Sequence, residues 1–144
     1  MTRIAGEIAI AAPVERVFDV VADERNEPRY NPRIARAEKL TAGPVGAGTR
    51  FVAETHRMRR SNTMTVEYLD YDRPRRLRSS IRSPVMDVEG TLTCEPAGGG
   101  TRLRWDWDMR LLGAARVLTP VLALVGPSWE RRNWVGLKRF IERG

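Results

Sequence analysis

Cysteine and histidine are almost absent from this sequence, which contains one residue of each. A single cysteine excludes a disulfide framework and a cysteine-rich zinc site, and a single histidine makes an all-histidine metal site implausible. Lysine is also scarce, since Lys39 and Lys138 are the only two. A membrane-spanning helix needs about 20 mostly apolar residues, and Arg116 and Pro120 interrupt the longest apolar stretch, residues 111–126. We therefore expect no metal site and no membrane span.

The remaining composition is that of one globular domain. The chain has 144 residues, of which 42% are hydrophobic and 30% are charged, and this length can bury one core but not two. We therefore expect a single domain over residues 1–144. The sequence opens Met1-Thr2-Arg3 with no apolar leader behind it, which favours a soluble, cytoplasmic protein.

The chain carries a formal charge of +7, from 25 Lys and Arg residues against 18 Asp and Glu residues. A surface of this sign attracts phosphates, anionic lipids or acidic ligands. The arginines are spread along the chain, with denser spots at residues 57–60, 73–78 and 131–132. No basic stripe with interleaved aromatic residues and no nucleic-acid motif accompanies them. We interpret the charge as a solvated surface and expect no nucleic-acid partner.

The hydrophobic period changes early in the chain. Residues 3–11 alternate apolar and polar side chains, which predicts a strand. From Pro13 to Val21 the apolar residues follow helical spacing instead, and proline suits the first position of a helix. Residues 23–32 are polar and hold two prolines, which predicts a broken helix or a loop.

Short strands at regular spacing follow from residue 34 onward. Residues typical of turns separate them at 43–48, 72–75, 83–84 and 98–100, which predicts an antiparallel meander. The last third is helical, and we expect Gly126-Pro127 to restart a helix that runs to about Arg143. The sequence thus predicts an α+β fold, in which a curved antiparallel seven-stranded sheet wraps around a long C-terminal helix.

Strand alternation assigns bulky and small side chains to the inner face of the sheet. Large and small residues interdigitate in an ordinary packed core, whereas the same set could line an apolar cavity with scattered polar groups. Both interpretations remain open from the pattern alone. The candidate ligand-binding residues are Phe51, Met64, Tyr68, Ser79, Met86, Val88, Trp105, Trp107, Trp129, Asn133 and Leu137.

No motif in the sequence identifies an enzyme. Asp87 and Glu89 share one face of a strand, but arginines on the neighbouring strands face them, which is typical of a solvated sheet face. His56 lies on a polar face, and neither Cys94 nor Ser128 has a sequence partner that would activate it as a nucleophile. The catalytic residues are therefore unassigned.

The sequence resembles the SRPBCC superfamily of START-like, birch-pollen-allergen-like helix-grip proteins. Within it, the chain is similar to the bacterial polyketide cyclase/dehydrase and lipid transport branch. The segments that carry the resemblance are residues 12–23 (APVERVFDVVAD), 30–32 (YNP), 46–51 (GAGTRF), 71–77 (YDRPRRL) and 99–103 (GGTRL). The resemblance implies a helix-grip fold with one or two short helices after the first strand, and a hydrophobic cavity between the sheet and the C-terminal helix.

The function implied is the binding of a small lipophilic ligand (a lipid, an isoprenoid or a polyketide-like molecule), as a carrier or sensor. An alternative is a cyclase, aromatase or dehydratase acting in the same cavity, which would need an acid or base inside it. Residues 111–125 either close the core through Val117, Val121 and Leu124 or make transient contact with a membrane surface. We expect no cofactor, and either a monomer or a homodimer.

Overall fold

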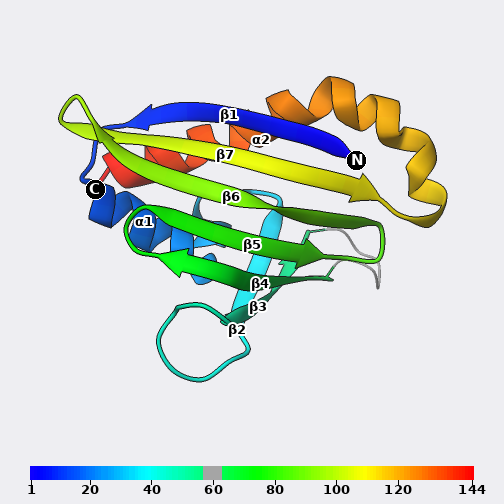
Figure 1. The fold of residues 1–144 in the computed structure, drawn as a ribbon, viewed down its shortest axis with the longest axis horizontal. Helices are drawn as coiled ribbons and strands as arrows, with labels where there is room; N and C mark the ends of the chain where they lie inside the picture. The colour runs from blue at the N-terminus through cyan, green and yellow to red at the C-terminus, as the bar shows by residue number, and fades with distance from the viewer. Residues whose placement is uncertain (57–62) are drawn as a thin grey trace.

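The computed structural model describes residues 1–56 and 63–144, so the arginine spot at 57–60 lies outside the described residues. The elements in chain order are β1 (Thr2–Ile10), α1 (Val14–Ala22), the 3-10 helix η1 (Glu24–Arg29), β2 (Ile34–Lys39), β3 (Arg50–Thr55), β4 (Thr63–Asp72), β5 (Arg76–Arg82), β6 (Met86–Ala97), β7 (Gly100–Leu111), the 3-10 helix η2 (Gly113–Leu118) and α2 (Thr119–Glu142). Figure 1 shows their arrangement.

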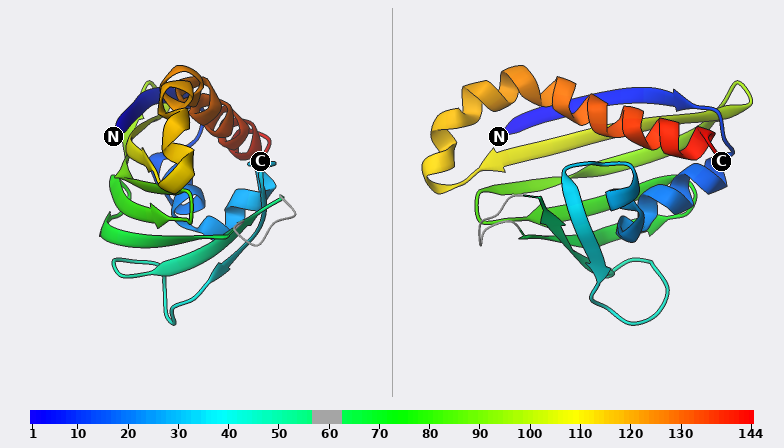
Figure 2. Two further views of the ribbon diagram at one scale, coloured as in Figure 1. Left: turned by 90° about the vertical axis from the view of Figure 1, so that its right-hand side faces the viewer. Right: turned by 180° about the vertical axis from the view of Figure 1, so that it is seen from behind.

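The strands form one antiparallel seven-stranded sheet in the order β1-β7-β6-β5-β4-β3-β2. The sheet curves, and α2 crosses its inner side. α1 lies near the C-terminal end of α2 (Figure 2). The predicted helix-grip fold is confirmed, and so is the meander, because each predicted break separates two observed strands.

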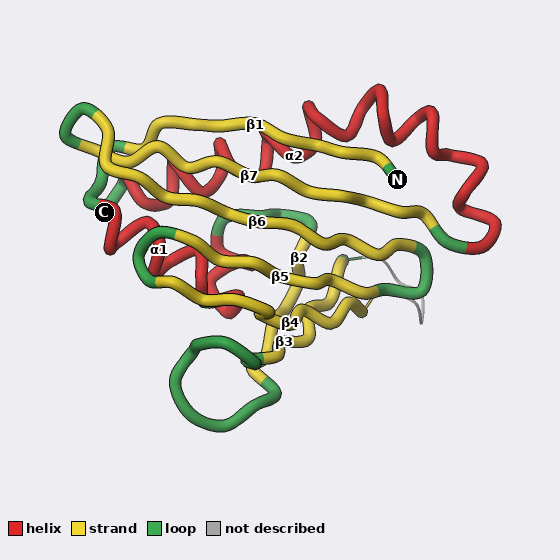
Figure 3. The backbone as a smooth tube through the Cα atoms, viewed as in Figure 1, coloured by secondary structure: helices red, strands yellow, loops and turns green. Residues whose placement is uncertain are grey.

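Alternation gives the sheet two chemically different faces. Along β7 the side chains of Leu103, Trp105 and Trp107 are buried while those of Arg104 and Asp106 between them are exposed. The long strands β6 and β7 (Figure 3) carry this alternation over 12 residues each. The buried face therefore points toward α2 and the polar face toward solvent.

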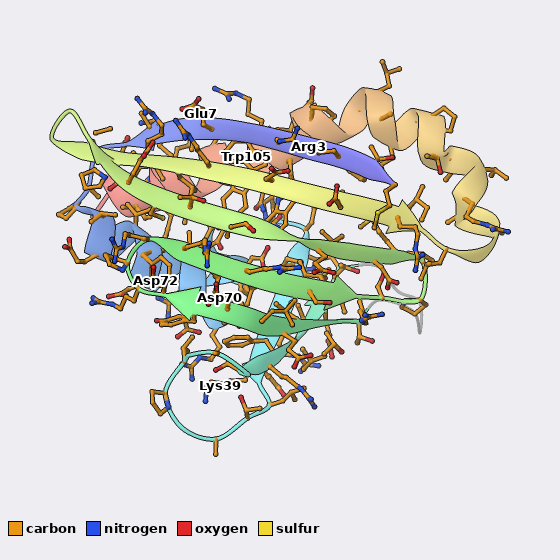
Figure 4. The ribbon with its side chains drawn as sticks, in the orientation of Figure 1. Arg3, Glu7, Lys39, Asp70, Asp72 and Trp105 are labelled. Carbon is orange, nitrogen blue, oxygen red and sulfur yellow. The ribbon has the colours of Figure 1, made fainter. Side chains whose placement is uncertain are left out.

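The outer face is held by cross-strand ion pairs, as predicted for Asp87 and Glu89. Arg82 and Arg110 flank Asp87 at 3.7 and 3.4 Å, and Glu89 pairs with Arg78. Figure 4 looks onto this face and labels Arg3, Glu7 and Asp70 on it. A shallow depression of about 520 Å³ lies here, but its charged side chains already neutralise one another, which makes it a solvated surface.

The start of the C-terminal helix differs from the prediction. We expected a restart at Gly126-Pro127, but α2 begins at Thr119 and runs unbroken through Pro127. Pro120 lies in the first turn of α2, where a backbone N–H would have no carbonyl partner within the helix. A proline, which lacks this N–H, is therefore favourable at the start of the helix. Gly126 brings the helix close to β1, because a Cβ there would lie 2.4 Å from Ile4 Cδ1.

Two smaller features complete the fold. Residues 23–32, predicted as a broken helix or loop, contain the 3-10 helix η1, which Asp23 caps by accepting a hydrogen bond from the Arg25 N–H. Within the described ranges, no helix combines the length and the apolar content that crossing a membrane requires.

Candidate functional site

One row of side chains crosses the middle of the inner face. Tyr68 pairs with Ser79, Ser79 with Gly90, Gly90 with Trp107, and Trp107 with Ile4 across five adjacent strands. Residues opposite each other in antiparallel strands share a face, so this row lies on the inner face of the sheet. Gly90 provides the space for the indole, since a Cβ there would approach Trp107 Cε3 to 2.6 Å.

Most of the predicted ligand-binding residues gather on this face. Those that are buried are Phe51, Tyr68, Ser79, Val88, Trp105, Trp107, Asn133 and Leu137. Met64 and Met86 lie on the same strand faces and are partly buried. Sequence alternation therefore identified the inner face correctly, while whether these side chains contact a ligand stays a prediction.

Trp129 does not lie inside with the others. Its side chain is 45% exposed, and the Arg33 guanidinium lies 4.7 Å above its ring. The tryptophan that α2 buries is Trp134, whose ring stacks on Trp105 at 5.6 Å between centroids. Helical spacing alone could not separate the two tryptophans, because Trp129 lies eight residues before the buried Leu137 and Trp134 lies three residues before it.

Three polar atoms in this interior are unpartnered among the described residues: Asn133 Oδ1, Trp107 Nε1 and Trp134 Nε1. Asn133 is 9% exposed, and the two indoles are 5% exposed each. A buried polar atom without a hydrogen bond costs about 1 to 3 kcal/mol. The inner face thus offers one acceptor and two donors to a polar group that enters it.

Glu130 adds a titratable carboxyl group that strand alternation could not reveal, because the residue lies on α2. Its side chain is partly buried. Burial raises the pKa of Glu130 to about 7, and the nearby Glu27 carboxyl adds to the rise, while Arg33 and the Trp107 N–H oppose it. Since Glu130 lies three residues before Asn133, both share one face of the helix.

Two further carboxyl groups approach from η1. Burial, and then the neighbouring Glu27 carboxyl, raise the pKa of Glu24 well above its usual range. The Tyr68 hydroxyl lies near Glu24 but donates its hydrogen bond to the Ala22 carbonyl oxygen at 2.7 Å. Burial and Glu27 also raise the pKa of Tyr30. This group, which we call the inner acidic cluster, comprises Glu24, Glu27 and Glu130.

Other candidate reactive groups have no part in this interior. Desolvation raises the pKa of the buried Cys94 thiol to about 12, so it stays protonated and unreactive at neutral pH. His56 is exposed. In residues 1–56 and 63–144, no three His, Cys, Asp or Glu side chains come together as a possible metal site.

The apolar residues of η2 and the first half of α2 do not close the core. Val117 and Leu124 are 80% and 81% exposed, and Val121 is also exposed. The expectation that these residues pack inward was therefore wrong. The segment projects past the end of β1 (Figures 1 and 2), although its Leu122 side chain packs against the core. The result is an apolar surface, Val117, Leu118, Val121, Leu124 and Val125, which we call the α2 apolar face.

The match to a known protein family extends over nearly the whole chain. The model of the family described as "Polyketide cyclase / dehydrase and lipid transport" matches residues 1–142. The chain belongs to this family. The resemblance to START-like SRPBCC proteins is thereby confirmed. No curated protein sequence matches the chain.

Solved structures share the fold of this polyketide cyclase / dehydrase and lipid transport family member. A START superfamily protein from Mycobacterium smegmatis is 14% identical, with a TM-score of 0.80 and 99% of each chain covered. The Zhui aromatase/cyclase from Streptomyces sp. R1128 is 18% identical, with a TM-score of 0.80, covering 98% of this chain and 93% of that one. A protein from Thermus thermophilus is 22% identical, with a TM-score of 0.79, covering 95% of this chain and 94% of that one. At these identities the likeness concerns the fold.

Proposed function

We propose that this protein binds a small lipophilic molecule between the inner face of the sheet and α2, as a carrier or sensor. The molecule would be a lipid, an isoprenoid or a polyketide-like compound. The observation that carries the proposal is the set of unpartnered polar atoms of Asn133, Trp107 and Trp134 in a mostly apolar interior. A core packed only for stability avoids such atoms because each one is costly, whereas a ligand-binding interior uses a few of them to orient its ligand.

The apolar residues of the inner face would supply most of the affinity. Burying one methylene group is worth about 0.8 kcal/mol, so ten methylenes give roughly 8 kcal/mol before costs. Association itself costs about 4 kcal/mol or more. The remainder corresponds to modest affinity, which suits a carrier that must release its cargo.

Native mass spectrometry of the purified protein, with organic extraction of what accompanies it, tests this proposal. A discrete lipophilic mass that leaves on extraction is the expected result. If the protein carries nothing and also fails to bind 1-decanol or decanoate in solution, the binding proposal is wrong.

A cyclase, aromatase or dehydratase activity is the second candidate, and Glu130 favours it. Such a reaction needs an acid or base beside the bound chain, and a carboxyl group with a pKa of about 7 can serve as either. Tyr68 is less suited to polarise a carbonyl, because its hydroxyl already donates to Ala22 O. Conversion of a model poly-β-ketone by the wild type but not by Glu130→Gln would support catalysis, and equal conversion by both would exclude Glu130 from it.

We also propose that the α2 apolar face makes transient contact with a lipid bilayer. Its exposed side chains, Val117, Val121 and Leu124, project from a segment whose only charge is Arg116. The net charge of +7 would draw such a surface toward anionic lipids. Sedimentation with vesicles of phosphatidylglycerol and phosphatidylcholine should pull down the wild type but not a Val117→Ser, Leu124→Ser variant. Equal recovery of both proteins would refute the contact.

A further inference from the structure

The arginines of α2 differ from those of the sheet in their partners. On the outer face of the sheet, arginines such as Arg76 and Arg78 pair with carboxylates of neighbouring strands. Arg132 and Arg139 are exposed on α2, and within the part of the chain that the structure describes neither of them forms an ion pair. The positive charge of this helix is therefore not neutralised by the protein itself.

Helical spacing places these two arginines on the same side of α2 as part of its apolar face. Val125, Arg132 and Arg139 follow one another at intervals of seven residues, which is close to two full turns. Val121 precedes Val125 by four residues, so the two are neighbours on the helix surface. All four side chains are exposed, and among the described elements none covers this side of α2 (Figure 2). We call Val121, Val125, Arg132 and Arg139 the α2 stripe, which is apolar in the first half of the helix and cationic in the second.

Trp129 lies where the α2 stripe changes from apolar to cationic. It follows Val125 by four residues and precedes Arg132 by three, so it neighbours both on the helix surface. Its side chain is 45% exposed, whereas the other three tryptophans are buried. The Arg33 guanidinium over its ring adds a further cation at this point. Indole rings are enriched where the hydrocarbon of a bilayer meets the lipid headgroups, because the ring is apolar and its N–H is polar.

We propose that α2 binds an anionic lipid bilayer obliquely, with Val121 and Val125 in the hydrocarbon, Trp129 at the interface, and Arg132 and Arg139 against lipid phosphates. This inference rests on the bilayer contact proposed above, and it adds the lipid class and the residues that select it. An α-helix rises about 1.5 Å per residue, so along the axis Val121 lies roughly 12 Å and Arg139 roughly 15 Å from Trp129. The hydrocarbon core of a bilayer is about 30 Å thick, so the apolar half of the α2 stripe would reach into one leaflet while the arginines stay among the headgroups.

The free arginines are the reason to expect anionic lipids. A guanidinium group forms two parallel hydrogen bonds with a phosphate, and each arginine close to an anionic membrane surface strengthens binding about fivefold. An arginine of the sheet would first have to leave its carboxylate, whereas Arg132 and Arg139 have none to leave. The acid nearest to them along this end of the helix, Glu142, already pairs with Lys138 at 2.6 Å.

Sedimentation with vesicles of phosphatidylcholine, with and without phosphatidylglycerol, tests the lipid class. The wild type should bind the vesicles that contain phosphatidylglycerol at least about tenfold more tightly than the neutral ones. The double variant Arg132→Gln, Arg139→Gln should bind the anionic vesicles about tenfold or more weakly than the wild type. The matched control, Arg75→Gln with Arg82→Gln, removes the same charge from two arginines that have carboxylate partners, and it should weaken binding by less than about threefold.

Fluorescence quenching by brominated phosphatidylcholine in the same vesicles tests the orientation. Bromine atoms on the acyl chains quench a tryptophan that reaches them, and Trp129 is the exposed one of the four tryptophans in this chain. Part of the wild-type fluorescence should therefore be lost when the protein binds. Trp129→Phe should lose none of its fluorescence on binding, because its remaining tryptophans are buried.

Each outcome has a distinct meaning. If the wild type binds both kinds of vesicle equally, or if the Arg132 and Arg139 variant binds as well as its control, the selection of anionic lipid by the α2 stripe is overturned while the bilayer contact stands. If Trp129→Phe is quenched as strongly as the wild type, another segment enters the bilayer and the proposed orientation is wrong. If the wild type binds neither kind of vesicle, the bilayer contact itself fails.

Discussion

Replacing Glu130 with glutamine should change how stability depends on pH. Burial raises the pKa of Glu130 from 4.5 to about 7 in the folded protein, so the folded state prefers the neutral carboxyl. The stability that this preference provides is complete below pH 4.5 and is lost as the pH rises through 7. A shift of this size corresponds to about 3 kcal/mol. Because the side chain keeps some contact with solvent, we expect about 2 to 3 kcal/mol.

Glutamine has nearly the same shape but cannot ionise. The free energy of unfolding of Glu130→Gln, relative to wild type, should therefore increase by about 2 to 3 kcal/mol between about pH 4.5 and pH 8. Urea denaturation at intervals of about half a pH unit, followed by tryptophan fluorescence, measures this difference. Asp108→Asn, which changes an exposed carboxyl on the outer face of β7, is the matched control. If the Glu130→Gln difference does not change with pH, Glu130 is not desolvated and the interior is more open to water than we argue.

Three further substitutions test the inner face. Trp107→Ala should weaken 1-decanol binding about tenfold or more because it removes apolar contact area. The control Asp87→Ala on the outer face should change the affinity by less than about twofold. Equal losses of affinity in calorimetry would mean that the two faces of the sheet are reversed. Gly90→Ala places a Cβ 2.1 Å from the Asp106 backbone oxygen and should lower the free energy of unfolding by about 3 kcal/mol. The control Gly46→Ala, with nothing within 4 Å of its Cβ, should change that free energy by less than about 1 kcal/mol. Similar urea midpoints for the two variants would contradict the close approach at Gly90. Tyr68→Phe leaves the Ala22 carbonyl unpaired and should cost about 1 to 3 kcal/mol in the same assay, and a wild-type midpoint would show that this hydrogen bond is unimportant.

The sheet could be predicted from the sequence because its signals are local. Alternation along β7 assigned Trp105 and Trp107 to the buried face, and turn residues marked four of the connections between strands, at 43–48, 72–75, 83–84 and 98–100. That arginines on the neighbouring strands pair with Asp87 and Glu89 also followed from alternation, since neighbouring strands of a meander pair in sequence order. In these strands the local pattern predicts the same buried and exposed side chains that the tertiary structure has.

The helical part was less predictable because its packing depends on distant residues. Trp129 and Trp134 are both plausible inward residues until the phase of α2 is fixed, and Gly126 against Ile4 fixes it. Glu130 could not be recognised as a candidate, since a charged residue on an amphipathic helix normally faces solvent. Its surroundings include Glu27 from η1 and Trp107 from β7, and the positions of both depend on the tertiary structure.

The position of β1 at one edge of the sheet has a consequence for the order of folding. β1 pairs with β7, so Thr2 lies opposite Met109 although more than 100 residues separate them in the chain. β4 to β7 can form hairpin by hairpin as they are synthesised, but β1 has no neighbour until β7 exists. The hydrogen bonds between α2 and the end of β1 form later still, because α2 follows β7 in the chain. In them, Lys138 donates to Ala9 O and Glu142 accepts from the Ala11 N–H. β1 thus leaves the ribosome before the other six strands of its sheet and is among the last to be fixed in place. The apolar side chains of Ile4 and Ile8 must stay exposed or shielded by other proteins until α2 is complete.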